Sequence, residues 1–147
     1  MNRDDVTELI VAARLRQGRS WADVAAAVGA SKEWVTAACL GQMAFSEAQA
    51  ATVVELFDLP GEAQPLLTAS PYRGSLPTAV PTDPLIYRFY ELVSVYGTTF
   101  KALIDEEFGD GIMSAIDFSM DVSRQADPAG DRVQIVMSGK FLPYRTY

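Results

Sequence analysis

The sequence predicts an α+β protein, in which a helical first half is followed by a small α+β second half ending in a β-hairpin. Apolar residues recur at spacings of three and four through the first half and again after Pro84, as they do on one face of a helix. From Ile112 the apolar period becomes two, as in a strand. Prolines and glycines cluster from Pro60 to Pro84, which indicates a linker. We therefore expect two domains, 1–74 and 75–147.

Four short helices are expected in the first domain. Ser20 and Ser31 are suited to cap two of them, because a serine oxygen can accept a hydrogen bond from a free N–H group of the first turn. The expected segments are residues 4–16, Ser20 to Gly29, Ser31 to Gly41, and Ser46 to Pro60. The side chains expected to face inward are Val6, Leu9, Ile10, Ala13, Leu15, Trp21, Val24, Ala25, Val28, Trp34, Val35, Ala38, Cys39, Ala50, Val53, Val54 and Phe57.

Residues 20–42 have the outline of a helix-turn-helix unit, with a glycine in the turn. A DNA-reading helix usually carries several Arg, Lys, Gln or Asn side chains, and the second helix here offers few. Acidic residues also outnumber basic ones over residues 1–74, which is the wrong sign for contacts with phosphates. We expect a packing module that does not bind nucleic acid. A helix-turn-helix transcriptional regulator with a C-terminal dimerisation domain remains the alternative.

The linker from Pro60 to Pro84 shows only a hint of a helical turn, at Leu66 and Leu67. The second domain then begins with two predicted helices. Thr82 or Asp83 can cap the first, and Pro84 fits its first turn, where the missing N–H is not needed. This helix is expected to end at Gly97, and the second, FKALIDEEF, to end before the next glycine.

The end of the chain is expected to form a β-hairpin with one apolar face. Ile112, Ser114, Ile116, Phe118, Met120 and Val122 alternate with a second set of side chains, so they are expected to share a face. The sequence ADPAGD (126–131) predicts a turn, RVQIVMS (132–138) a second strand, and Gly139-Lys140 a second turn. A two-stranded hairpin needs another layer to cover its apolar face. Another subunit is one such partner.

Composition narrows the possible functions. The chain has 147 residues, 49% of them apolar, a net charge of -7 and no histidine. It therefore lacks the commonest general base near neutral pH and the commonest metal ligand, and one thiol without an imidazole cannot build a zinc site. Carboxylates alone could still hold Mg²⁺ or Ca²⁺, but the sequence has no EF-hand or P-loop spacing, and no metal site or cofactor is expected. The single cysteine, Cys39, lies on an apolar helix face and is expected to be structural. No signal peptide or membrane span is expected, and we predict a cytoplasmic protein.

Arg88 and Glu91 lie three positions apart on a predicted helix, so their side chains are neighbours. The surrounding positions are aromatic or aliphatic, and a charged pair in such a setting loses much of its water when the helix is packed all round. Spacing alone equally allows an ordinary surface ion pair, which contributes about 0–1 kcal/mol.

Ser114 is the one polar residue in the expected apolar row of its strand. A buried hydroxyl needs a hydrogen-bond partner, which makes Ser114 a candidate site residue. The preceding Gly109-Asp110-Gly111 allows a close approach of the backbone and can direct N–H groups toward an anion. The alternative is a small side chain that hydrogen-bonds the local backbone.

The stretch YRFYELVSVYGTTFKALIDEEFGDGIMSAIDF closely resembles the cyanase family (cyanate hydratases), and the ending SGKFLPY is similar as well. The segments WVTAACLGQ and PYRG…PTDP extend the resemblance to essentially the whole chain. Cys39 stands where a small aliphatic residue is expected, a departure that touches no catalytic position. The resemblance implies that Arg88, Glu91 and Ser114 are the catalytic residues.

The resemblance also implies a repressor-like N-terminal domain without DNA binding and a C-terminal domain whose strands interlock with those of a second subunit. Five such dimers would form a decamer with active sites between subunits. The implied reaction joins cyanate to bicarbonate, a co-substrate, and gives carbamate and CO₂, after which carbamate decays to ammonia and CO₂. Neither a histidine nor a metal is required, because bicarbonate is itself the nucleophile and can supply a proton.

Overall fold

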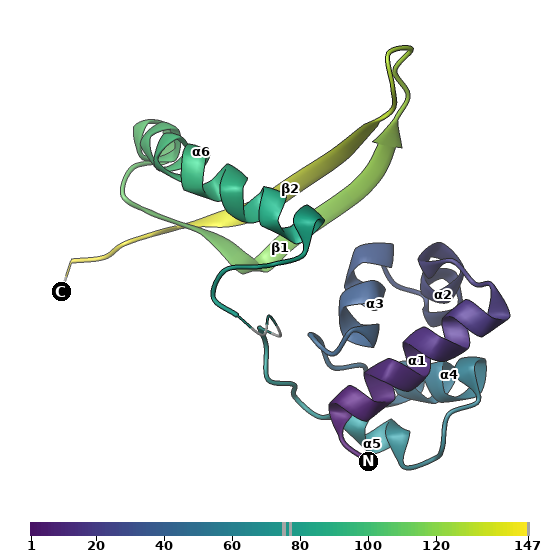
Figure 1. Cartoon of the computed structure of the whole chain (residues 1–147). Coiled ribbons are helices and arrows are strands. Elements are labelled where there is room, and N and C mark those ends of the chain that lie inside the picture. The colour runs from purple at the N-terminus through teal and green to yellow at the C-terminus, as the bar shows by residue number, and fades with distance from the viewer. Residues whose placement is uncertain (75, 77, 147) are drawn as a thin grey trace. The chain divides into compact units, whose positions relative to one another are not determined.

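The computed structural model describes residues 1–74, 76 and 78–146. The chain divides into two compact units, Met1–Ser75 and Leu76–Tyr147 (Figure 1). The first consists of helices and the second of one helix and one β-hairpin, which confirms the α+β class.

The described part of unit 1 contains five helices: α1 (Arg3–Gln17), α2 (Trp21–Val28), α3 (Lys32–Cys39), α4 (Glu47–Phe57) and α5 (Ala63–Thr68). The predicted serine caps are confirmed, since the side chains of Ser20 and Ser31 accept hydrogen bonds from the backbone N–H groups of Asp23 and Trp34. Ser46 caps α4 in the same way. In α2 and α4 the third residue of the helix also bonds back to the cap, which completes a capping box.

The helices of unit 1 enclose one apolar core. Its buried members are Val6, Ile10, Ala13, Val24, Ala25, Val35, Ala38, Cys39, Phe45, Ala50, Val53, Phe57, Leu59, Ala63 and Leu67. The expected inward positions are largely confirmed, but Leu9 and Leu15 are exposed. The interpretation of residues 60–84 as linker was too broad, because α5 lies within it and fully buries Leu67. A helix this short is stabilised by burial against the rest of the bundle, which its local sequence does not show.

Unit 2 begins with α6, a single helix over Pro84–Phe108. The predicted break at Gly97 was wrong. A helix tolerates an interior glycine at a cost of about 1 kcal/mol relative to alanine, and Gly97 is not among the residues with positive φ. Of the two predicted caps, Asp83 is the one used: its carboxylate accepts hydrogen bonds from the N–H groups of Leu85 and Ile86 at 2.9 and 3.0 Å.

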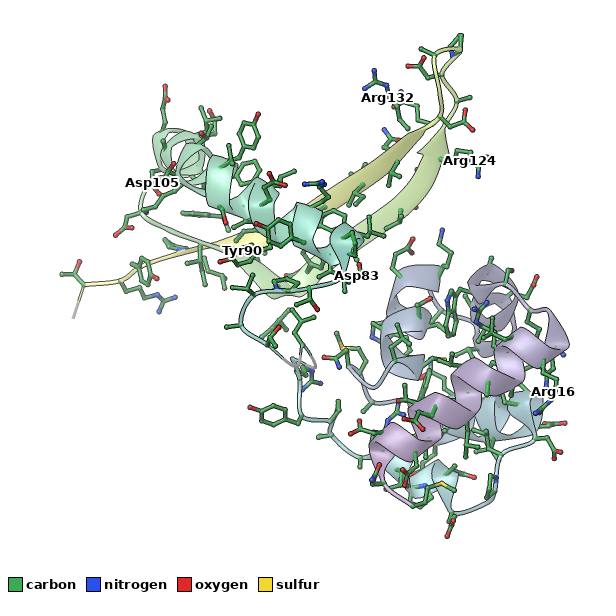
Figure 2. All side chains as sticks on the ribbon, viewed as in Figure 1. Arg16, Asp83, Tyr90, Asp105, Arg124 and Arg132 are labelled. Atoms are coloured by element: carbon green, nitrogen blue, oxygen red, sulfur yellow. The ribbon has the colours of Figure 1, made fainter. Side chains whose placement is uncertain are left out.

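The hairpin pairs β1 (Gly111–Gln125) with β2 (Arg132–Pro143) in antiparallel orientation. The predicted turn at 126–131 is confirmed. The second predicted turn, at Gly139-Lys140, was wrong, because β2 continues through both residues. Figure 2 shows Arg124 and Arg132 near the turn. They pair with carboxylates of the turn itself: Arg124 Nη1 lies 3.2 Å from Asp131 Oδ2, and Arg132 Nε lies 3.0 Å from Asp127 Oδ2.

The pairing register shifts in the middle of β1, where a β-bulge interrupts it. Met113 lies opposite Phe141, and the next paired residue, Phe118, lies opposite Gly139. Residues 114–117 of β1 therefore face Lys140 alone. Positions 139 and 141 share a face of β2, so Met113 and Phe118 share a face of β1. The predicted uninterrupted alternation from 112 to 123 was wrong, because the extra residues of the bulge exchange the two faces.

Candidate functional site

Arg88 and Glu91 form an ion pair in the second turn of α6. Arg88 Nη1 donates to Glu91 Oε2 at 2.6 Å. Pro84 and the cap at Asp83 determine where this helix begins, and the spacing of three residues then places both side chains on one face. The sequence interpretation of the two residues as neighbours is confirmed.

The ion pair is exposed within one chain: the side chains of Arg88 and Glu91 are 71% and 48% exposed. An exposed pair contributes about 0–1 kcal/mol to stability, so stability alone gives little reason for this arrangement. Tyr87 and Tyr90 lie on the same stretch of helix, with ring centroids 5.9 Å apart. Figure 2 shows Tyr90 on the first half of α6. Glu91 thus holds the guanidinium of Arg88 through one hydrogen bond from Nη1. The guanidinium has further N–H donors that this bond does not use.

Ser114 lies in the bulge of β1 and is the one buried polar residue among those described, with 5% of its surface exposed. Its Oγ accepts hydrogen bonds from the backbone N–H groups of Ile116 and Asp117, both at 3.0 Å. A hydroxyl has two acceptor lone pairs and one hydrogen to donate. Because both lone pairs are used, the hydrogen of Ser114 is what remains for another group. The alternative prediction, a serine that hydrogen-bonds the local backbone, is therefore right for the lone pairs of Ser114. These bonds leave its hydroxyl hydrogen available to a ligand.

Within the described part of one chain, the hydrogen bonds join Arg88 to Glu91 and join Ser114 to its own strand, and none joins Ser114 to the ion pair. Two of the three candidate residues are thus brought together. A cavity of about 570 Å³ lies in unit 1 and has none of the three in its lining.

The surface around these residues is strongly apolar. None of the 25 residues of α6, all of which are described, is buried. The large apolar side chains that α6 exposes are Leu85, Ile86, Tyr87, Phe89, Tyr90, Leu92, Val93, Val95, Tyr96, Phe100, Leu103 and Phe108. The hairpin exposes Ile112, Met113, Ile116, Met120, Val133, Val136, Met137 and Leu142. A helix that is apolar on all sides is typical of a protein interior.

Cys39 lies outside this region, fully buried in the core of unit 1, and burial raises the pKa of its thiol to about 12. This agrees with a structural role. No group of three or more His, Cys, Asp or Glu residues that could hold a metal ion occurs among the described residues. No helix in that same part of the chain is long and apolar enough to cross a membrane.

Comparisons with known proteins add a second line of evidence. The family model for the N-terminal part of cyanate hydratase matches residues 3–71, and the model for the C-terminal domain of cyanate lyase matches residues 78–146. A cyanate hydratase of Cupriavidus necator is 71% identical over 147 residues, covering all of both chains. The chain belongs to the cyanate hydratase (cyanase) family. The resemblance noted from the sequence is thereby confirmed.

Other relatives agree. The cyanate hydratase of Ralstonia pickettii is 69% identical, again over the whole of both chains. The crystal structure of cyanase from T. urticae superposes with a TM-score of 0.81 at 36% identity, covering 94% of this chain and 96% of that one. The match runs through both units, so the alternative of a transcriptional regulator is not favoured.

One residue that bears on the site was missed by the sequence interpretation. Gly139 was assigned to a turn, but it lies on β2 opposite Phe118, directly beside the bulge that carries Ser114. The Gly139-Lys140 pair gives no local signal that Gly139 lies against the bulge, because the bulge is on a strand more than 20 positions away in the sequence.

Proposed function

We propose that this protein is a cyanase that combines cyanate with bicarbonate to give CO₂ and carbamate, which then decays to ammonia and a second CO₂. The observation that carries the proposal is the whole-chain similarity to cyanate hydratases. The arrangement of Arg88, Glu91 and Ser114 supports it, because the reaction needs groups that bind small anions and stabilise negative charge.

Arg88 is the anion-binding group in this proposal. Cyanate and bicarbonate repel one another, and their adduct carries two negative charges. A guanidinium has several N–H donors in a planar fork and can hold both anions at once. Its charge stabilises the adduct more than it stabilises either separate anion, so it lowers the barrier to addition. Glu91, at 2.6 Å, holds the guanidinium in one orientation. A carboxylate does not itself bind an anion.

Ser114 is the second polar contact. With its two lone pairs occupied by backbone N–H groups, its hydroxyl can donate to an oxygen of the substrate. Bicarbonate oxygen adds to the cyanate carbon, and the nitrogen of the adduct takes two protons, one from the hydroxyl of the former bicarbonate and one from solvent. The bond between the transferred oxygen and the former bicarbonate carbon then breaks, which releases CO₂ and leaves the cyanate carbon in carbamate.

We also propose that the working enzyme is a homo-oligomer, with five dimers forming a decamer in the cytoplasm, and that it uses no cofactor and binds no nucleic acid. The support for oligomerisation is the apolar surface of α6 and the hairpin, which a single helix on a two-stranded sheet does not cover. Covering that surface would also remove water from Arg88 and Glu91, and hydrogen bonds to anions are stronger in such a setting. The active sites would then lie between subunits.

The route of each carbon atom tests the proposed reaction. Cyanate labelled with ¹³C is mixed with unlabelled bicarbonate and the purified protein, and carbamate and CO₂ are followed at early times by ¹³C NMR. The label is expected in carbamate first and in CO₂ only as carbamate decays. Early label in CO₂ at the full rate of cyanate loss would contradict the proposed bond cleavage.

A further inference from the structure

The bulge that carries Ser114 depends on a close approach between the two strands. A Cβ atom added at Gly139 would overlap the carbonyl oxygen of Ser114 and would lie 2.6 Å from Cγ of Met113. Gly139 is not among the residues with positive φ, so the backbone conformation itself does not require glycine. What requires it is space, and the nearest obstacle is the backbone of the proposed catalytic serine.

A second glycine faces the same side of the hairpin at the other end of this region. A Cβ at Gly111 would lie 2.5 Å from the carbonyl oxygen of Leu142 and 2.5 Å from the ring of Phe141. Met113 and Phe141 are directly opposite each other. The side chain of Met113 lies over Gly139, and the ring of Phe141 lies over Gly111. The ring of Phe141 also packs against Phe108 at the end of α6, with centroids 5.3 Å apart. The segment before the bulge is thus held in place from both strands.

The bulge itself is closed by Ser114. Its Oγ accepts hydrogen bonds from the backbone N–H groups of Ile116 and Asp117. Ile116 itself is 99% exposed. These two bonds orient the hydroxyl as a donor only. Any shift of the Ser114 backbone changes where that donor points, and the carbonyl of the same residue is what contacts Gly139.

We propose that Gly139 is a positioning residue for the reaction: by leaving room for the Ser114 carbonyl, it keeps the bulge in the form that presents the Ser114 hydroxyl to the substrate. The kinetic part of this inference rests on the proposed function. The structural part, that Gly139 determines the shape of the bulge, does not.

A double-mutant cycle tests the kinetic part. Gly139→Ala, Ser114→Ala and the double variant are compared with the wild-type protein for kcat and KM with cyanate. A hydrogen bond to a charged group corresponds to about a 10- to 100-fold effect, so Gly139→Ala is expected to lower kcat by about that factor. In the Ser114→Ala background the same substitution is expected to change kcat by less than about twofold, because the hydroxyl it misplaces is already gone. Equal losses in both backgrounds would overturn the inference, and so would unchanged kcat in Gly139→Ala.

Gly61→Ala is the matched control, since a Cβ at Gly61 meets nothing within 4 Å and its φ is not positive. It is expected to keep wild-type kcat and the wild-type oligomer. If Gly139→Ala does not assemble, Met113→Ala/Gly139→Ala is compared with Met113→Ala alone. The added Met113→Ala removes the overlap with the methionine side chain and retains the one with the Ser114 carbonyl.

Amide hydrogen exchange tests the structural part without any turnover. Because Ser114 Oγ accepts the N–H groups of Ile116 and Asp117, exchange at these two amides is expected to be faster in Ser114→Ala and in Gly139→Ala than in the wild type. Unchanged exchange in Gly139→Ala would overturn the inference whatever the kinetics. If the wild-type protein does not decompose cyanate, the proposed function fails, and the exchange result still decides whether Gly139 shapes the bulge.

Discussion

Replacing Arg88 by lysine separates the role of its charge from the role of its planar fork. The positive charge stays, but an ammonium cannot hold two anions in a fixed plane as a guanidinium does. At least one hydrogen bond to a charged substrate is lost, which costs about 1.5–3 kcal/mol. We therefore expect kcat/KM for cyanate to fall by at least about 10- to 100-fold.

The same substitution should leave the fold intact. Lysine keeps a positive charge beside Glu91, so the carboxylate is not left without a counter-charge where other subunits cover it. Thermal unfolding and the molar mass from light scattering should therefore match the wild type.

The assay is ammonia release at saturating bicarbonate, with cyanate varied. Arg124→Lys is the matched control, since Arg124 pairs with Asp131 near the turn of the hairpin and has no role in the proposed reaction. It should keep wild-type turnover. Near-normal turnover of Arg88→Lys in a correctly assembled oligomer would refute the role given to Arg88.

Three further predictions concern groups outside the site. Cys39, with a pKa of about 12 and no exposed surface, should resist thiol-labelling reagents at pH 8 in the folded protein and react after denaturation; rapid labelling of the native protein would contradict its burial. Gly97→Ala should raise stability by about 0.5–1 kcal/mol, because the new Cβ meets one valine carbon at 3.6 Å, an ordinary contact; a lower melting temperature would mean that another subunit occupies that space. Hydrogen bonds from the backbone N–H of Ala129 and, second, from Arg132 hold the pKa of Asp127 below 3.8. Its contribution to stability is therefore present above that pH and is lost as the pH falls through the lowered pKa. Asp127→Asn should flatten that part of the pH–stability curve, and an unchanged curve would count against the contribution.

The features that the sequence predicted well are those decided by nearby residues. Ser20, Ser31 and Asp83 cap helices because each side-chain oxygen meets an N–H group two or three positions on. The Arg88–Glu91 pair likewise follows from helical spacing alone. Local chemistry is sufficient for such features, since both partners lie on the same element.

The features that the sequence did not predict depend on distant contacts. The burial of Leu67 decides α5, and the long helix α6 continues through Gly97 although glycine usually marks a helix end. The bulge that holds Ser114 exists because two strands approach closely at Gly139, which no periodicity shows. For the same reason the sequence placed Ile112 and Phe118 on one face, whereas the register shift separates them.

Bicarbonate is a reactant in the proposed chemistry, and ammonia release from cyanate by the purified oligomer in buffer stripped of CO₂ tests this directly. The rate is expected to be close to zero without bicarbonate, to rise on its addition and to saturate. Rapid ammonia release that does not depend on bicarbonate would show that water attacks cyanate and would contradict the proposed reaction. No release with or without bicarbonate, from an oligomer of the expected mass, would contradict it equally.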